Sequence, residues 1–248
     1  TKVGAGTLVL SGTNSYSGTT TVSAGVLELK NGSAIDNAAA GVAVEATGQL
    51  KVTDAETVRK VEGAGGLTLN ATLTTGDATD AELSGVLAGT AGLTKVGTGT
   101  LELSGATANT YAGATAVNAG TLKVSKATGL GATGTGTTVS SGATLEINNV
   151  DIGTEALSIA GVGVDGGVGG IGALVGTGAG ALAGGTVALA ADSRIGGAGT
   201  LGLGGVVSGG FALTKVGAGT LELSGAAANT YSGATAVNAG TLKVSKAA

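Results

Sequence analysis

Two pairs of carboxylates are the residues of this sequence whose spacing could support catalysis. Asp77 and Asp80 stand in the segment TTGDATD, and Asp151 and Glu155 stand in NVDIGTE. Paired carboxylates can serve as the acid and the base or nucleophile in the cleavage of glycosidic bonds. Neither pair has a tryptophan or tyrosine beside it, and the chain has few arginines. We therefore interpret both pairs as solvated loop residues, and we expect no catalytic residue and no enzyme activity.

The residue types that most other catalytic and metal sites require are absent. The chain has no histidine and no cysteine, which excludes a serine or cysteine protease site and a zinc site within this stretch. Asp77, Asp80 and Glu82 are close enough in sequence to share a calcium ion with backbone carbonyls. An incidental loop explains them better, so we predict no metal and no cofactor, while the sequence leaves calcium near Asp77 and Asp80 open.

The composition limits both the interior and the partners. The 248 residues include 51 glycines and four Tyr or Phe residues in all, so Leu, Val, Ile and Ala must fill the interior. This favours a thin, layered interior, and a hydrophobic share of 42% with 11% charged residues argues against long disorder. The net charge of −4 and the lack of a basic stripe exclude nucleic acid as an expected partner.

One uncharged segment, residues 166–191, is long enough to span a bilayer. Because it consists largely of glycine and alanine, it has little membrane affinity. We interpret it as short strands joined by glycine turns, and we predict no transmembrane segment. The same segment is the best sequence candidate for a less polar contact patch.

Internal repetition is the strongest feature of the chain. Related blocks occupy residues 1–30, 94–127 and 214–247, and the last two differ only at Thr98/Ala218, Thr107/Ala227 and Ala112/Ser232. Repeats of this kind predict a stacked architecture. We expect a single β-helical segment over residues 1–248, excerpted from a longer protein.

Strands are indicated by apolar-x-apolar triplets whose middle residue is often charged. In Leu101-Glu102-Leu103, for example, the two leucines should face the interior and Glu102 should face water, because side chains alternate along a strand. Equivalent triplets return about every twenty residues, and only residues 54–61 suggest a helical turn or a plain loop. The pattern predicts an all-β fold, a right-handed parallel β-helix (solenoid) of about a dozen coils of roughly 20 residues. The short interval from the triplet at 145 to that at 157 predicts coils of variable length. The triplets are Leu8/Leu10, Leu27/Leu29, Leu50/Val52, Leu67/Leu69, Leu101/Leu103, Leu122/Val124, Leu145/Ile147, Leu157/Ile159, Val187/Leu189, Leu201/Leu203, Leu221/Leu223 and Leu242/Val244.

The repeated block also contains residues with an expected structural role. Its glycines should form tight turns and corners, its asparagine should cap a turn through its side chain, and its tyrosine should cover a corner of the solenoid. Stacking of the tyrosine ring on a sugar is the alternative. The structural repeat residues are Leu101, Leu103, Asn109, Tyr111, Gly113, Gly120, Leu122, Val124, Leu221, Leu223, Asn229, Tyr231, Gly233, Gly240, Leu242 and Val244.

The block LTKVGxGTLELSGxxxNTYxGxTxVxAGTLKV closely resembles the passenger-associated repeat of bacterial autotransporters. The resemblance covers residues 93–126 and 213–246 well and residues 1–30 less closely. It implies a β-helical passenger domain that type V secretion carries across the outer membrane of a Gram-negative bacterium. It also implies a C-terminal outer-membrane barrel in the parent protein.

From this resemblance we expect a structural or adhesive passenger segment at the bacterial cell surface, a rigid scaffold for adhesion, aggregation or biofilm contact. The expected partners are a host or abiotic surface, matrix polysaccharide, or other copies of the chain. Two alternatives stay open: a pure stalk that presents an effector located elsewhere, and a polysaccharide lyase or hydrolase built on a β-helix.

Overall fold

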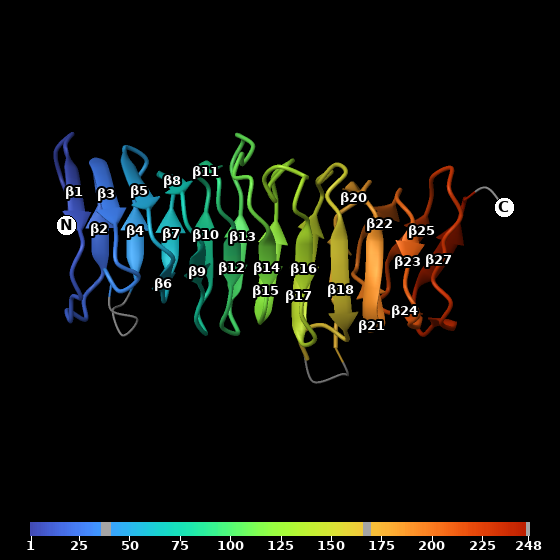
Figure 1. Cartoon of the computed structure of the whole chain (residues 1–248). Coiled ribbons are helices and arrows are strands. Elements are labelled where there is room, and N and C mark those ends of the chain that lie inside the picture. Colours follow the sequence, from blue (N-terminus) through green and yellow to red (C-terminus); the bar gives the residue numbers. More distant parts are fainter. Residues whose placement is uncertain (36–40, 166–169, 247–248) are drawn as a thin grey trace.

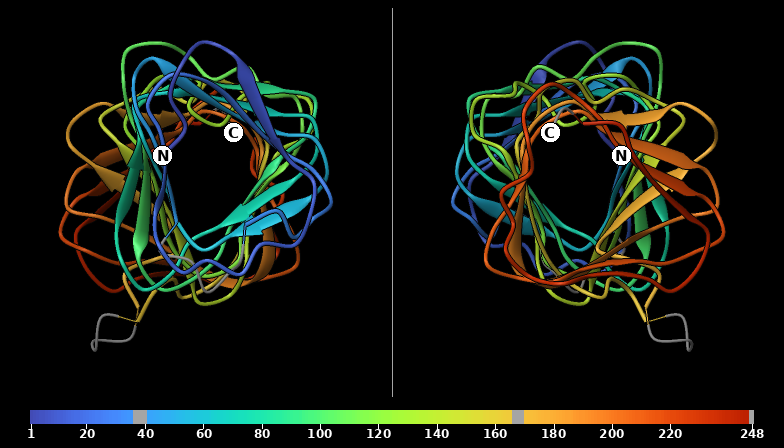
Figure 2. Two further views of the ribbon diagram at one scale, coloured as in Figure 1. Left: turned by 90° about the vertical axis from the view of Figure 1, so that its left-hand side faces the viewer. Right: turned by 90° about the vertical axis from the view of Figure 1, so that its right-hand side faces the viewer.

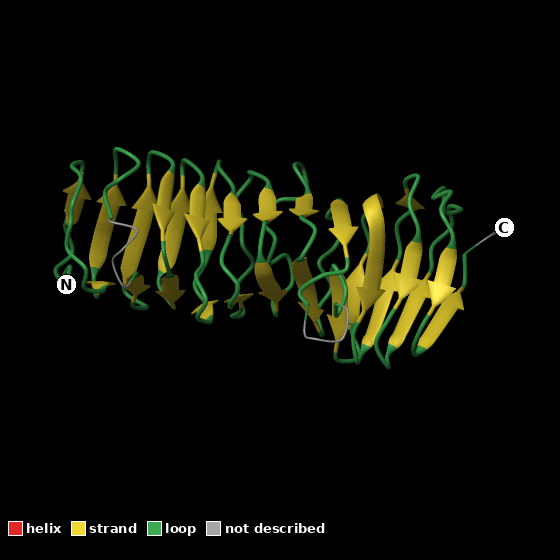
Figure 3. Ribbon diagram, turned by 90° about the horizontal axis from the view of Figure 1, so that it is seen from below, coloured by secondary structure: helices red, strands yellow, loops and turns green. Residues whose placement is uncertain are grey.

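The protein is a straight solenoid of parallel β-strands, and its first and last described coils lie at opposite ends of a rod (Figure 1). The computed structural model describes residues 1–35, 41–165 and 170–246. Within these ranges there are strands, turns and loops and no helix (Figure 3). The chain makes about 11 coils of roughly 21 residues each, which confirms the predicted all-β parallel solenoid.

Each coil has three faces, and all strand pairs are parallel and join strands of successive coils. Face A begins with five strands and resumes with four more near the C-terminus. Between the two sets, loop backbone continues the stack: Tyr111 N donates to Leu87 O, and Ala132 N donates to Tyr111 O. The strands of face A are β1 (Thr7–Leu10), β3 (Gly25–Leu29), β5 (Gly48–Val52), β8 (Gly66–Leu69), β11 (Leu87–Gly89), β20 (Ala181–Ala183), β22 (Thr200–Leu203), β25 (Thr220–Leu223) and β27 (Thr241–Val244).

Faces B and C are both continuous, and the long strand β21 (Val187–Gly196) contributes its first half to face B and its second half to face C. Face B also contains β6 (Glu56–Val58), β9 (Leu73–Thr75), β12 (Leu93–Lys95), β14 (Thr115–Val117), β16 (Thr137–Val139), β18 (Leu157–Gly161) and β23 (Val207–Ser208). Face C also contains β2 (Thr20–Val22), β4 (Val42–Val44), β7 (Val61–Gly63), β10 (Ala81–Leu83), β13 (Thr100–Leu103), β15 (Gly120–Val124), β17 (Ala143–Asn148), β19 (Leu174–Thr177), β24 (Leu213–Lys215) and β26 (Thr235–Val237).

The coils surround a common centre when the ribbon is viewed along its length (Figure 2). The interior is made of columns of aliphatic side chains that run along the axis of the solenoid. On face A, for instance, Leu27 stacks on Leu50, Leu50 on Leu67, and Leu67 on Leu87, and all four are buried. In-register pairing places side chains of the same type in contact from coil to coil. Aliphatic residues can therefore fill a thin interior without aromatic residues. The inward position predicted for such triplets is confirmed.

Two of the predicted triplets lie on a different face from the triplets that precede and follow them in the sequence. Leu157/Ile159 and Val187/Leu189 lie in β18 and β21 on face B, whereas Leu145/Ile147 lies in β17 on face C. The short interval between residues 145 and 157 is therefore a step to another face of the same solenoid. The predicted variation in coil length is confirmed elsewhere, since Leu67 pairs with Leu87 and Leu145 pairs with the more distant Leu174. A two-residue period reports which side chains point inward but does not report the face.

Two segments with ambiguous patterns are also strands. Residues 54–61 contain β6 and the start of β7, so both the helical turn and the plain loop expected there were wrong. Of the uncharged segment, residues 166–169 lie outside the described residues, and the rest forms β19, β20 and the first part of β21, as predicted. No helix long and apolar enough to cross a membrane occurs in the described part of the chain.

The repeated blocks are not all presented on the same faces. In the first and third blocks, the Lys-Val-Gly segment begins on face C. There Lys2 forms a parallel β-bridge with Val22, and Lys215 pairs in register with Ile195. In the second block the same segment follows face B, where Lys95 pairs with Thr75. The second block is thus placed one face away from the other two around the axis.

Candidate functional site

Each block carries a lysine whose side chain runs into the solenoid and ends in a cradle of carbonyls. Lys95 is 1% exposed, and its Nζ donates to Val96 O at 2.6 Å, Gly97 O at 2.9 Å and Ala119 O at 3.2 Å. The first two acceptors belong to its own coil, and Ala119 belongs to the next coil. Lys215 repeats this arrangement with Val216, Gly217 and Ala239. The ammonium group therefore fastens two successive coils at a corner.

Lys2 makes the same set of bonds in the first block, to Val3 O, Gly4 O and Ala24 O. The sequence reasoning missed these lysines because lysine is seldom buried. The alternation of inward and outward positions along the strand does indicate that this lysine points inward. In Leu93-Thr94-Lys95 the lysine occupies the same parity as the inward leucine.

Burial changes the acid–base properties of these lysines. It lowers the pKa of Lys95 to about 8, although the nearby carboxylates of Asp77 and Asp80 act in the opposite direction. Burial also lowers the pKa of Lys215. Removal of an ammonium from water disfavours its charged form, and the carbonyl cradle returns part of that solvation.

Glycine is required where the lysine meets the corner. Gly97 has φ of +71°, and a Cβ there would lie 2.4 Å from Asp77 O. Gly120 has φ of +64°, and its Cβ would lie 2.9 Å from the Nζ of Lys95. Any side chain at these two positions would displace either the coil below or the ammonium group.

Asn109 connects neighbouring coils rather than its own turn. Its Oδ1 accepts a hydrogen bond from Leu87 N at 3.0 Å, and its Nδ2 donates to Gly129 O at 2.7 Å. Leu87 lies one coil before and Gly129 one coil after, so the expected local turn cap was wrong. Asn229 Oδ1 accepts from Val207 N in the same way.

Tyr111 is completely buried, and its hydroxyl lies 2.6 Å from Thr115 Oγ1. Burial raises the pKa of this phenol. The ring packs in the core cluster, so it has no exposed face on which a sugar could stack. Tyr231 makes the matching bond to Thr235 but is only partly buried, because no further described coil covers it.

The inward leucines and valines of the blocks, like the tyrosines, are buried where a further coil covers them. Leu101, Leu103, Leu122, Val124, Leu221 and Leu223 are buried. In the last described coil, Leu242 packs against the core but remains partly exposed, and Val244 is exposed. Val244 pairs in register with the buried Leu223 and so keeps the predicted inward parity; it is exposed because no further described coil covers it.

The carboxylates of the first candidate pair are used in structural bonds. Asp77 Oδ2 accepts from Arg59 Nε at 2.9 Å, and its Oδ1 accepts from the backbone and hydroxyl of Thr79. Burial opposes ionisation of Asp77, but these hydrogen bonds prevail and lower its pKa. Asp80 Oδ1 accepts from Thr100 N at 2.7 Å. In the part of the chain that the structure describes, no group of three or more acidic residues could hold a metal ion.

The second candidate pair is split by burial. Asp151 is exposed and accepts a hydrogen bond from Gly153 N, whereas Glu155 is 2% exposed and accepts from Thr137 Oγ1 at 2.7 Å. Burial raises the pKa of Glu155. The side chain of Glu155 lies among interior residues, so the pair does not face one groove.

Charged side chains, most of them glutamates, form an outward column on face C. Glu82 stacks directly on Glu102, Glu102 on Lys123, and Lys123 on Glu146. Lys123 Nζ lies 3.3 Å from Glu102 Oε1. Glu62 and Asp80 extend the column into a shallow acidic depression of about 560 Å³. The sequence predicted the outward position of Glu102 and Lys123 but not this gathering, because it did not give the faces.

A closed aliphatic interior, in which buried lysines and asparagines join successive coils, defines a β-solenoid repeat protein. The comparison with family models agrees: the passenger-associated-transport-repeat matches residues 1–29, 93–124 and 213–244. The chain thus carries three copies of this repeat, as an autotransporter passenger domain with β-repeats does. Neither the search of curated proteins nor the search of solved structures gave a match.

Proposed function

We propose that this chain is a structural and adhesive segment of a surface-displayed or secreted autotransporter passenger in a Gram-negative bacterium. The three repeats and the parallel solenoid fit such a passenger. One observation carries the proposal: the buried lysine, the asparagine and the aliphatic columns all bond or pack between coils. These contacts between coils make the rod rigid. The outward side chains are left exposed at its surface, where they can make many weak contacts.

The proposed partners are a host or abiotic surface, matrix polysaccharide or other copies of the chain. Outward side chains are stacked coil upon coil along the axis, so a repetitive partner would meet successive side chains about 4.8 Å apart. Many weak contacts along one rod raise avidity without a deep pocket. The engagement of Asp77, Asp80 and Glu155 in structural hydrogen bonds supports this role over catalysis.

A deletion separates an adhesive role from that of a pure stalk. Removal of residues 94–213 joins Leu93 to Thr214 and restores the Leu-Thr-Lys-Val sequence at the junction. The full chain and the shortened chain are displayed on beads at equal density, and bead attachment to glass and to polysaccharide films is measured. We expect attachment to fall roughly in proportion to the length removed, because contacts are distributed along the rod. Unchanged attachment per bead would show that the segment is only a spacer.

A further inference from the structure

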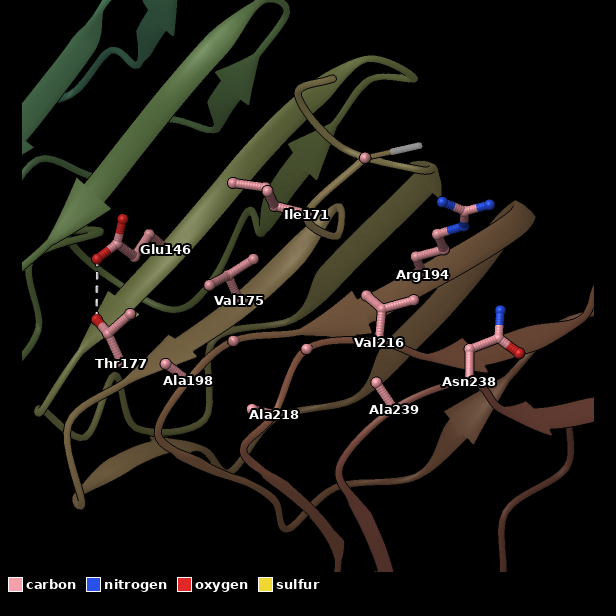
Figure 4. A pocket seen from close by; sticks show the side chains of 13 residues that line it. Glu146, Ile171, Val175, Thr177, Arg194, Ala198, Val216, Ala218, Asn238 and Ala239 are labelled. Carbon is pink, nitrogen blue, oxygen red and sulfur yellow. Dashed lines mark hydrogen bonds between the residues drawn. The ribbon is translucent and has the colours of Figure 1, made fainter. Parts of the chain in front are cut away.

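An apolar groove on the outside of the C-terminal third differs from every other outward surface described above. It encloses about 640 Å³ where face C meets the next corner, and Glu146, Val175, Arg194 and Val216 are among the residues around it (Figure 4). Figure 4 shows Glu146 at one end of the groove and Arg194 and Asn238 at the other. The outward column of face C changes here from charged to aliphatic, because Glu146 stacks on Val175.

The groove exists because small residues are stacked at one corner over three coils. Gly197 lies beneath Gly217, whose Cβ would be 2.6 Å from Gly197 O, and Ala198, Ala218 and Ala239 add only methyl groups. The second block provides an internal comparison. There, Asp77 lies beneath Gly97 in the place of Gly197, and it is bonded to Arg59 at 2.9 Å. The open apolar corner therefore depends on the coils beneath the third block, which contain Gly197 and Ala198, and is not a property of the repeat itself.

Arg194 places a positive charge at one end of the groove, two residues after Asp192 on the outward side of β21. Its side chain is half-buried on the outward side of β21, where it pairs in register with Thr214. Within residues 1–35, 41–165 and 170–246, no hydrogen bond or ion pair joins its guanidinium to another side chain. By contrast, Arg59 is paired. Glu146, at the far end, accepts a hydrogen bond from Thr177 Oγ1 at 2.8 Å and does not reach Arg194.

We propose that this groove binds a small amphipathic monocarboxylate, with its apolar body on the alanine and valine surface and its carboxylate on Arg194. A volume of about 640 Å³ lies in the range of small-molecule sites. A guanidinium recognises a carboxylate through two parallel N–H···O bonds. The glutamate at the opposite end disfavours a second negative charge, and the aliphatic lining offers little to a polar sugar.

Octanoate is a suitable probe, with 1-octanol as its uncharged counterpart. Each is titrated into the ¹⁵N-labelled full chain, and amide chemical shifts are followed. We expect octanoate to move the signals of Val175, Val216 and Ala218 in a saturable manner. Arg194→Gln should weaken octanoate by about five- to tenfold, because one charge-assisted contact at a half-exposed site is lost, and should leave 1-octanol unchanged.

Two further variants distinguish the groove from the repeat. Ala218→Leu fills the groove at an exposed position and should weaken both probes, whereas Thr98→Leu changes the counterpart in the second block and should affect neither. The amide spectrum of each variant reports whether it is folded. If octanoate moves no groove signal, or if it binds Arg194→Gln as tightly as the original chain, the proposal is wrong.

Discussion

At the scale of single residues, the buried lysine of each block gives the sharpest test. Lys95→Met keeps most of the side-chain volume but leaves the carbonyls of Val96, Gly97 and Ala119 without their donor. We expect a loss of about 1–3 kcal/mol in the free energy of unfolding at pH 7. Chemical denaturation measures it, with Lys123→Met as the control. Lys123 is a half-exposed member of the outward column, and its loss should change stability by less than about 1 kcal/mol.

The same pair of chains has a predictable pH dependence. The pKa of Lys95 is about 8 in the folded protein and about 10.5 ordinarily, so between these values the unfolded chain holds a proton that the folded chain has released. Raising the pH through this window therefore favours the folded state. The difference in the free energy of unfolding between the original chain and Lys95→Met should therefore increase from pH 8 to 10.5, by up to about 3 kcal/mol. A gap that stays constant or narrows would contradict the burial of the ammonium.

At the scale of the coil, two tyrosines in nearly identical sequence differ only in what covers them. Tyr111 is fully buried beneath the next coil, where Gly131 approaches its backbone, whereas Tyr231 is partly exposed. Tyr111→Ala should cost about 3–5 kcal/mol, as expected for a large buried ring, and Tyr231→Ala should cost clearly less. Thermal unfolding of both variants checks this. Equal losses would mean that the local turn, rather than the neighbouring coil, stabilises the ring.

The sequence revealed strands and inward positions at this scale, but it did not reveal faces. Leu101/Leu103 and Leu157/Ile159 show the same alternation and yet lie on faces C and B. Leu174 was not recognised as the successor of Leu145, because its partner position is Gly176 and not an apolar side chain. The acidic depression and the apolar groove depend on which faces and corners are stacked, so neither could be predicted from alternation.

At the scale of the whole molecule, the repeats are arranged with different rotations about one axis. The Leu-Thr-Lys strand is on face B in the second block and on face C in the third, and both versions bury the lysine. The block therefore tolerates either face, because the carbonyls that hold the lysine belong to the block itself, as Val96, Gly97 and Ala119 do for Lys95. In a solenoid, where each coil contacts only its neighbours, such a unit can be moved along the rod.

The 94–213 deletion tests this interchangeability as a question of folding. Lys215 would take the place of Lys95 above Thr75, and Tyr231 would take the place of Tyr111. We expect a cooperative thermal transition and a β-sheet circular dichroism spectrum like those of the full chain. Deletion of residues 94–214 removes one residue more and shifts Lys215 to the outward parity, which inverts every side chain that follows until a loop corrects it. That variant should melt at a clearly lower temperature. If both deletions fold equally well, the junction does not depend on the buried lysine; if neither folds, the block is specific to its face.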